Sequence, residues 1–326
     1  MKPSVVKDAL KQCIAAKRPT HIWGPPGVGK SEIVAQIAKE LDLELTDVRA
    51  VLLDPVDLRG LPKINDDGMA HWCPPAFLPK DGKGILFLDE LNAAPPLVQA
   101  ACYQLILDRK LGEYVLPEEW VILAAGNRET DRAVTSRMSS ALANRFVHIY
   151  FDVDVNDWID WALGNGITTE LIAFIRFRPE LLHSFDPKKN EKAFPTPRSW
   201  EFVSDVLQAG SSNIEYELAS GIVGEGASTE LMAFLKIYRN LPNPDVILLD
   251  PSAGEIPQDP ATLYAICGSL ANKASDQNFG RVVEYSNRLP DEFSVLLIRD
   301  AVKRDNQLSL TRAFIEWTSV HSEILI

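Results

Sequence analysis

In the first half of the chain, short apolar runs of strand length alternate with segments whose apolar residues recur at helical spacing. The strand-like runs cover residues 20–23, 43–53, 84–90, 120–125 and 147–151. The helical patterns cover residues 4–16, 32–41 and 95–108, and the last of these opens with two prolines, which suit the first turn of a helix. Strands that alternate with helices in this way predict an α/β fold, with a parallel sheet flanked by helices.

Two segments inside this half have the pattern of β-hairpins. Residues 61–72 carry Asn-Asp-Asp-Gly at their centre between two extended stretches, and residues 109–117 carry Gly112 between two shorter ones. Residues 54–60, just before the first hairpin, contain proline, aspartate and glycine and are predicted to form a turn. We therefore expect two hairpins inserted into the α/β fold.

Beyond residue 152, strand-like runs become rare and helical periodicity dominates. The helical patterns cover residues 157–163, 170–177, 200–207, 229–238, 260–274 and 281–286. Residues 187–197 are predicted to form a loop, and the proline- and aspartate-rich residues 240–259 to separate two helical parts. The expected organisation is an α/β nucleotide-binding domain over residues 1–152, a helical lid over 153–240 and a helical C-terminal extension over 241–326.

A phosphate-binding loop stands between the first predicted strand and the helix that follows it. Residues 24–31 read Gly-Pro-Pro-Gly-Val-Gly-Lys-Ser, a complete match to the pattern G-x-x-x-x-G-K-[ST]. In such a loop, backbone N–H groups curl around phosphate oxygens, the lysine adds positive charge at the β- and γ-phosphates, and the serine hydroxyl ligates Mg²⁺. The predicted nucleotide contacts are therefore Gly24, Pro25, Pro26, Gly27, Val28, Gly29, Lys30 and Ser31.

Two adjacent carboxylates end the apolar run over residues 84–90. Ligands of α/β sheets bind at the carboxyl ends of the strands, so Asp89 and Glu90 are expected beside the phosphate loop. Asp89 is predicted to hold Mg²⁺ together with Ser31, and Glu90 to polarise the attacking water for in-line transfer. A carboxylate that activates water distinguishes a hydrolase from a protein that only binds a nucleotide.

Three further polar side chains are candidates for contact with the γ-phosphate. Asn127 follows the next apolar run, where its amide would bond the phosphate or orient the water without adding charge. Arg145 precedes the last strand and is predicted to reach the phosphate of a neighbouring subunit, with Arg137 and Arg132 on the same segment as alternatives. Arg198 stands where a loop becomes a helix and is predicted to contact the nucleotide from the helical half. A turn asparagine and plain surface arginines are the competing interpretations.

The composition is that of an acidic globular protein. The net charge of −12 and the pI near 5.0 argue against a large nonspecific nucleic-acid surface and favour protein clients. The chain has no apolar run long enough to span a bilayer and no signal-peptide pattern at its start, so we expect a cytoplasmic protein without a membrane segment. The 4 cysteines lack the spacing of a zinc site and are interpreted as reduced thiols.

The order of these motifs resembles that of the AAA+ ATPases. The likeness assigns residues 24–31 to Walker A, Asp89 and Glu90 to Walker B, Asn127 to sensor 1, Arg145 to the arginine finger and Arg198 to sensor 2. Residues 89–96, Asp-Glu-Leu-Asn-Ala-Ala-Pro-Pro, are similar to the Asp-Glu-x-Asn-x-Ala-Pro-Pro segment of the MoxR family, and the two hairpins resemble its helix-2 and pre-sensor-1 inserts. The likeness covers about residues 1–240, and it departs at Ala93, where arginine is frequent in the family.

This resemblance implies an ATP-driven, chaperone-like enzyme that uses ATP and Mg²⁺. Members of the family form hexameric rings that remodel partners, often with a von Willebrand factor A domain protein, which implies a ring here with Arg145 acting in trans. Two alternatives stay open. One is a nucleotide-gated scaffold that recruits a partner and turns ATP over slowly, and the other is a DNA-acting motor or loader, which the acidic charge disfavours.

Overall fold

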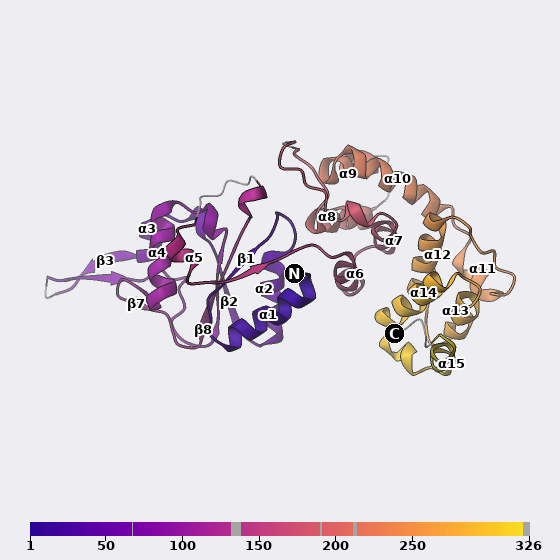
Figure 1. Cartoon of the computed structure of the whole chain (residues 1–326), viewed down its shortest axis with the longest axis horizontal. Helices are drawn as coiled ribbons and strands as arrows, with labels where there is room; N and C mark the ends of the chain where they lie inside the picture. The colour runs from indigo at the N-terminus through magenta and orange to yellow at the C-terminus, as the bar shows by residue number, and fades with distance from the viewer. Residues whose placement is uncertain (67, 132–137, 190, 211–213, 322–326) are drawn as a thin grey trace. The chain divides into compact units, whose positions relative to one another are not determined.

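A computed structural model describes residues 1–66, 68–131, 138–189, 191–210 and 214–321 (Figure 1). The chain divides into two compact units. The first consists of residues 1–154 and 186–190, and the second of residues 155–185 and 191–326. The predicted division of the helical part into a lid and an extension at residue 240 stays a prediction.

The first unit is built on a five-stranded parallel sheet with the strand order β2-β5-β8-β1-β9. Its strands are β1 (Thr20–Trp23), β2 (Glu44–Arg49), β5 (Gly84–Asp89), β8 (Trp120–Gly126) and β9 (Val147–Tyr150). Every residue of β5 and β8 is buried, as expected of strands that are covered on both faces. The predicted α/β fold with a parallel sheet is confirmed. The strand predicted over residues 43–53 is shorter, because the chain turns into a 3₁₀ helix after Arg49, the last residue of β2.

Helices cover both faces of this sheet (Figure 1). One face packs against two helices around Ile22 and Phe87, and the other packs against a second helical layer around Leu88 and Ile122. The helices on the first face are α1 (Pro3–Ala15) and α2 (Lys30–Glu40), and those on the second are α3 (Pro55–Arg59), α4 (Pro96–Asp108) and α5 (Ser140–Ala143). Short 3₁₀ helices connect some of these elements: η1 (Ala50–Leu52), η2 (Leu91–Ala93) and η3 (Glu129–Asp131).

Both predicted hairpins are present. β3 (Leu61–Ile64) pairs antiparallel with β4 (Ala70–Cys73), and β6 (Lys110–Leu111) with β7 (Tyr114–Val115). The β3–β4 hairpin projects from the rest of the first unit, and every residue of both strands is exposed (Figure 1). The two hairpins touch, because Nδ1 of His71 lies 3.1 Å from Oε2 of Glu113.

The turn predicted over residues 54–60 is wrong, because most of this segment forms helix α3. Asp54 caps the helix, and its own backbone N–H donates to the Asp57 carboxylate at 2.8 Å. Pro55 occupies the first turn, where its missing N–H costs no hydrogen bond. Residues that favour turns thus serve here as a helix start.

The second unit is helical throughout the part that the structure describes, as predicted. Its α-helices are α6 (Val155–Gly164), α7 (Thr169–Phe177), α8 (Pro197–Ala209), α9 (Glu215–Val223), α10 (Glu225–Arg239), α11 (Pro244–Leu249), α12 (Pro260–Lys273), α13 (Phe279–Ser286), α14 (Asp291–Arg304) and α15 (Arg312–Val320). Two 3₁₀ helices, η4 (Pro179–Leu181) and η5 (Asn306–Leu310), lie between them. Helices α9, α11, α14 and α15 were not predicted individually, and α11 lies inside the proline- and aspartate-rich stretch that was expected to separate two helical parts. Among the described residues, no helix has both the length and the apolar character needed to cross a membrane.

A buried ion pair joins the two halves of the second unit. Arg176 of α7 and Asp300 of α14 are 6% and 2% exposed, and Nη2 of Arg176 donates to Oδ1 of Asp300 at 2.6 Å. A second bond runs from Nη1 to Oδ2, so the pair is bidentate. Helices from the segment predicted as lid and from the segment predicted as extension therefore share one interior.

Replacing Asp300 by alanine is expected to lower the free energy of unfolding of this unit by about 3–5 kcal/mol, because Arg176 would keep a buried, unpaired charge. The double variant Arg176→Met, Asp300→Leu is expected to recover most of that loss, since it removes both charges and keeps the volume. Thermal and urea unfolding of the full chain measures both effects. Arg312→Ala, which removes an ion pair whose arginine is 90% exposed, is the control and should leave the midpoint unchanged. Equal unfolding midpoints for Asp300→Ala and the double variant would contradict this account.

Candidate functional site

The phosphate loop joins β1 to α2 and takes its shape from glycines. Gly27 and Gly29 have φ angles of 76° and 96°, in the region that favours glycine. Gly29 is the N-cap of α2, so the free N–H groups of that helix start at the loop. Gly24 lies against the end of β9, where a Cβ atom would come within 3.1 Å of the Phe151 carbonyl oxygen. The loop therefore has the backbone geometry that phosphate binding requires.

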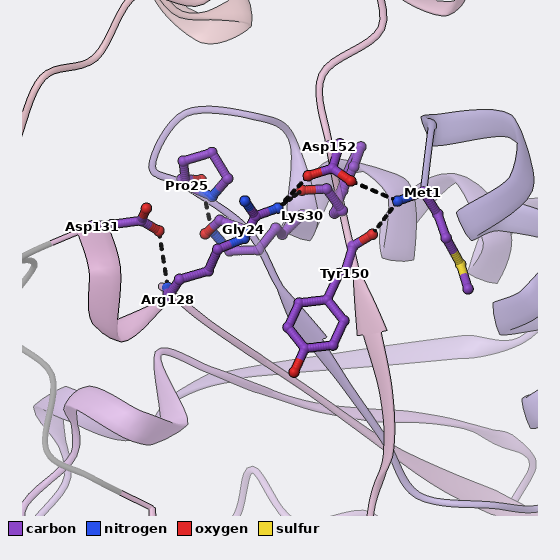
Figure 2. Close-up of polar contacts among 9 residues, drawn as sticks. Met1, Gly24, Pro25, Lys30, Arg128, Asp131, Tyr150 and Asp152 are labelled. Atoms are coloured by element: carbon purple, nitrogen blue, oxygen red, sulfur yellow. Dashed lines mark hydrogen bonds and ion pairs between the residues drawn. The ribbon is translucent and has the colours of Figure 1, made fainter.

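Lys30 connects the phosphate loop to the end of β8. Its ammonium donates to the carbonyl oxygens of Gly24 at 2.8 Å and Pro25 at 3.0 Å, a pair of contacts visible in Figure 2. It also donates to Oδ1 of Asn127 at 2.9 Å. Asn127 follows β8 directly. The structure thus brings together Lys30 and Asn127, which the sequence analysis predicted separately as contacts of the nucleotide.

Ser31 and Asp89 form the second contact between the loop and the sheet. The Ser31 hydroxyl donates to Oδ2 of Asp89 at 2.9 Å, and Oδ1 of Asp89 accepts from the Glu90 backbone N–H at 2.9 Å. A hydroxyl and a carboxylate are the oxygen ligands that Mg²⁺ takes when it is bound together with substrate phosphates. Among the described residues, no cluster of three or more His, Cys, Asp or Glu side chains offers an all-protein metal site. The pair therefore fits an ion that arrives with a nucleotide.

A second carboxylate adds negative potential near Asp89. Asp47 lies on β2, next to β5 in the sheet. Burial, and then the negative charge of Asp89, raise the pKa of the Asp47 carboxyl. Carboxylates that repel each other favour a cation between them and the phosphates, which is consistent with the Mg²⁺ assignment. The sequence prediction did not single out Asp47, because β2 contains several polar residues and nothing in the sequence distinguishes Asp47 from them.

Glu90 leaves the sheet in a strained conformation. Its φ of 56° places it in the left-handed region, which residues other than glycine seldom adopt. It lies between Asp89, which is bonded to Ser31, and the 3₁₀ helix η2. Strain of this kind persists only where the surroundings fix it, and it concentrates at functional sites. The strain is consistent with the predicted role of Glu90.

Asn92 is a residue of the site to which the sequence prediction gave no role. It is 2% exposed, and its Nδ2 donates to the backbone carbonyl oxygen of Asn127 at 2.8 Å. In the sequence, Asn92 stood out only as the asparagine of the Asp-Glu-x-Asn segment. That segment indicated a family resemblance but assigned no role to Asn92.

Arg128, which follows Asn127, is a further polar residue that the prediction missed. Its Nη2 donates to the Phe151 carbonyl oxygen at 2.8 Å and also pairs with the Asp152 carboxylate (Figure 2). The N-terminal ammonium donates to Asp152 at 2.8 Å, and this contact, followed by Arg128, lowers the pKa of the Asp152 carboxyl. The backbone N–H of Arg128 donates to Asp131 at 2.9 Å. These contacts join the N-terminus to the segments that follow β8 and β9.

The structure describes two of the four predicted arginines. Arg145 follows α5, its Cζ atom stands 5.5 Å from the centre of the Tyr103 ring, and Nη1 donates to the Ala141 carbonyl oxygen at 3.3 Å. Arg198 is exposed in the first turn of α8 and belongs to the second unit. The alternatives Arg132 and Arg137 lie outside the described residues. The roles of all four arginines stay predictions.

His21 is a buried residue of β1 next to the candidate site. It is 0% exposed, its ring stacks on Trp23 with centroids 4.0 Å apart, and both of its ring nitrogens lack a partner among the described residues. Burial, and then the positive charges of His148 and Lys30, lower the pKa of His21 to about 3. His21 is therefore neutral in the folded protein at neutral pH.

The low pKa of His21 predicts acid sensitivity of the first unit. Between pH 6.5 and about 3 the unfolded chain binds a proton at His21 that the folded chain does not, so stability falls as the pH drops below 6.5. The loss approaches about 1.4 kcal/mol per pH unit. His21→Phe removes this group. When the pH is lowered from about 7.5 to about 5.5, values on either side of the unperturbed histidine pKa, the unfolding midpoint of this variant is expected to fall less than that of the wild type. Equal slopes for the two proteins would contradict the assignment.

Comparisons with known proteins agree with this geometry. Residues 19–146 match the sequence model of the AAA domain (dynein-related subfamily). Over 178 residues, 51% of this chain, the sequence is 29% identical to midasin of Giardia intestinalis, and the matched part spans 4% of that protein. The matched segment 19–146 contains the phosphate loop, Asp89, Glu90, Asn127 and Arg145. The predicted parallel sheet flanked by helices and followed by a helical region is confirmed, residues 19–146 match an AAA domain, and the MoxR resemblance stays a prediction.

Two solved structures are similar at low identity. The RuvB Holliday junction branch migration motor of Thermotoga maritima is similar over 82% of this chain and 81% of its own, with 18% identity and a TM-score of 0.40. NtrX of Brucella abortus, solved in complex with ATP, is similar over 97% of this chain and 66% of its own, with 14% identity and a TM-score of 0.40.

Proposed function

We propose that this protein is an AAA+ ATPase that hydrolyses Mg-ATP. The observation that carries the proposal is the pairing of two adjacent loop residues with two strand ends. Lys30 bonds Asn127 after β8, and Ser31 bonds Asp89 at the end of β5. A phosphate loop alone would fit any nucleotide-binding protein, whereas these contacts bring it to a carboxylate and an amide suited to hydrolysis.

Each residue of the cluster has a distinct task in this proposal. The N–H groups at the start of α2 and the Lys30 ammonium bind the phosphates, and Lys30 exchanges its contacts with Gly24 and Pro25 for phosphate oxygens. Ser31 and Asp89 would hold Mg²⁺, which neutralises charge that develops on the phosphates. Glu90 accepts a hydrogen bond from the attacking water and orients it toward the γ-phosphorus.

Three residues complete the proposed site around the γ-phosphate. Asn127 donates its amide to the phosphate or the water, and Arg198 is proposed as a further residue that senses the γ-phosphate. Arg145 is proposed to act on the nucleotide of the neighbouring subunit, which makes hydrolysis depend on assembly.

Replacing Lys30 by alanine is expected to abolish the stabilisation that Mg-ATP gives to the folded protein. A ligand at 100 times its dissociation constant stabilises by about 2.7 kcal/mol, and that increment disappears when the affinity collapses. Thermal unfolding with and without Mg-ATP measures the effect. Lys39→Ala, at the exposed end of the same helix, is the matched control and should keep the full shift. A full shift in Lys30→Ala would show that the nucleotide does not bind at this loop.

The second part of the proposal concerns the work that ATP hydrolysis drives. We propose a MoxR-like, chaperone-like motor: a hexameric ring that remodels a protein client, with a von Willebrand factor A domain protein as the expected partner class. The exposed β3–β4 hairpin supports a client contact, because Leu61 and Ile64 are 69% and 74% exposed on it. Its contact with the β6–β7 hairpin, through His71 and Glu113, offers a route by which movement at one hairpin reaches the other.

A pull-down from the native cell tests the client proposal. The Glu90→Gln protein, which is expected to stay in the ATP state, should retain a specific partner in Mg-ATP and release it in ADP. Ile64→Asp in the same background is expected to lose the partner while it still binds ATP. Equal recovery of the partner in ATP and ADP would contradict a nucleotide-driven cycle.

A further inference from the structure

Asn92 bridges the two strand ends of the candidate site. It lies in the 3₁₀ helix η2, two residues after Glu90, and its Nδ2 donates across the sheet to the carbonyl oxygen of Asn127 at 2.8 Å. Because a carbonyl oxygen only accepts hydrogen bonds, the amide nitrogen of Asn92 has to face Asn127. The contact therefore has one orientation.

The backbone beside Asn92 is shaped to admit it. A Cβ atom on Gly126 would stand 2.0 Å from Oδ1 of Asn92, a distance that no side chain tolerates. Glycine at position 126 thus lets the Asn92 amide lie directly on the backbone of residues 126 and 127. Asn92 is 2% exposed, and its Oδ1 has no hydrogen-bond partner among the described residues. A buried amide with one unsatisfied atom costs stability, so packing alone does not account for it.

We propose that Asn92 is a positioning residue that holds Asn127 in register with Glu90, an inference that rests on the proposed ATPase function. Asn92 fixes the carbonyl of Asn127, and the Asn127 side chain accepts from Lys30 at 2.9 Å. On the other side, η2 follows Glu90 directly, and Asp89 before it is bonded to Ser31. Asn92 therefore connects the residue that polarises water to the residue that senses the γ-phosphate.

The chemistry explains why an exact fit at this position matters. Hydrolysis needs the water and the γ-phosphate within a fraction of an ångström of their productive geometry, and a displacement of 1 Å costs about 10²-fold in rate. Glu90 and Asn127 follow different strands, β5 and β8, and the pairing of these two strands ends at Leu88 and Ala124. Asn92 supplies a link beyond that last pair.

Two measurements on the full chain test the proposal. The first is the affinity ratio between a non-hydrolysable ATP analogue and ADP, both with Mg²⁺, which reports γ-phosphate sensing without turnover. The second is the steady-state rate of phosphate release. Both are measured for the wild type, Asn92→Ala, Asn127→Ala and the double variant.

The expected result is non-additive. Asn92→Ala should lower the affinity ratio by roughly tenfold and keep ADP binding within about threefold, as expected for the loss of one hydrogen bond to a charged group. Asn127→Ala should show the same loss, and the double variant should be no worse than Asn127→Ala alone. Independent, multiplying effects would overturn the proposal, as would an unchanged ratio in Asn92→Ala. Absence of phosphate release in the wild type with the ratio pattern intact would instead overturn the proposed function alone.

Two more variants separate positioning from general loosening. Gln99→Ala removes another buried amide, whose Nε2 donates to the Ala94 carbonyl oxygen at 3.0 Å, and it is expected to lower stability without changing the affinity ratio. Gly126→Ala displaces Asn92 without altering it and should reproduce the Asn92→Ala ratio. A lowered ratio in Gln99→Ala, or a normal ratio in a folded Gly126→Ala, would overturn the proposal.

A pH profile gives a readout that a purely structural role would not produce. Asn92→Asp keeps the size of the side chain, but its carboxylate cannot donate to the Asn127 carbonyl, whereas the protonated acid can. Burial raises the pKa of such a carboxyl, so its affinity ratio relative to the wild type should rise as the pH falls from about 8 to about 6. A relative ratio that is flat across this range would contradict donation by residue 92.

Discussion

Replacement of Arg145 by alanine is expected to lower kcat for ATP by about 10³-fold or more, with ATP affinity nearly unchanged. An arginine that reaches a neighbouring subunit's γ-phosphate stabilises charge that develops only in the transition state, so its loss affects turnover more than binding. In the described part of the chain no carboxylate forms an ion pair with Arg145, whose recorded contacts are the Tyr103 ring and the Ala141 carbonyl oxygen. The guanidinium is thus held by weak contacts, which in the proposed role a phosphate of the neighbouring subunit would replace.

The measurement is steady-state phosphate release together with nucleotide affinity. Arg145→Lys keeps the charge but loses the planar fork, and it should fall between the wild type and Arg145→Ala. Arg312→Ala, an exposed arginine of the second unit, is the control and should be as active as the wild type. Near-normal turnover in Arg145→Ala would move the assignment to Arg137 or Arg132, or exclude an arginine finger on this segment.

Replacing Glu90 by glutamine is expected to lower kcat by about 10²- to 10⁴-fold and to leave ATP binding intact. Glutamine keeps the shape of the side chain but carries no negative charge, so it polarises water poorly. Asp89 and Ser31, the proposed Mg²⁺ ligands, remain in place, as does Lys30, the proposed phosphate contact.

Phosphate release and ATP affinity should be measured on one preparation of the Glu90→Gln protein. Glu44→Gln is the matched control, because Glu44 begins β2 opposite Gly84, at the edge of the sheet away from the phosphate loop. Wild-type turnover in Glu90→Gln would remove Glu90 from the mechanism, and loss of ATP binding would show that it acts in the ground state.

The core and the conformation of the phosphate loop were predictable because each rests on a local pattern. The apolar runs of β5 and β8 are buried on both faces, so nothing interrupts them in the sequence. Residues 24–31 carry the loop chemistry in one continuous stretch, and their strand and helix flank them directly. In such segments local preference and tertiary environment agree.

The rest depends on contacts between residues far apart in the sequence. Asn92 was missed because its function lies in a hydrogen bond to a residue 35 positions away, which no spacing rule reveals. Helix α3 was misread because Asp54 and Pro55 suit a turn and a helix start equally well. The joining of α7 and α14 through Arg176 and Asp300 was invisible for the same reason, since each residue reads as an ordinary charge on a helix.

The most direct test of an assembly-dependent ATPase is to mix the two inactive variants, Glu90→Gln and Arg145→Ala. If Arg145 completes the site of the neighbouring subunit, a mixed assembly contains interfaces with an intact Glu90 on one side and an intact Arg145 on the other. Random equimolar mixing makes about a quarter of the interfaces complete. The account predicts that the mixture recovers roughly that fraction of wild-type phosphate release, far above either variant alone. A mixture that is as inactive as its components, under conditions where the subunits exchange, would contradict it.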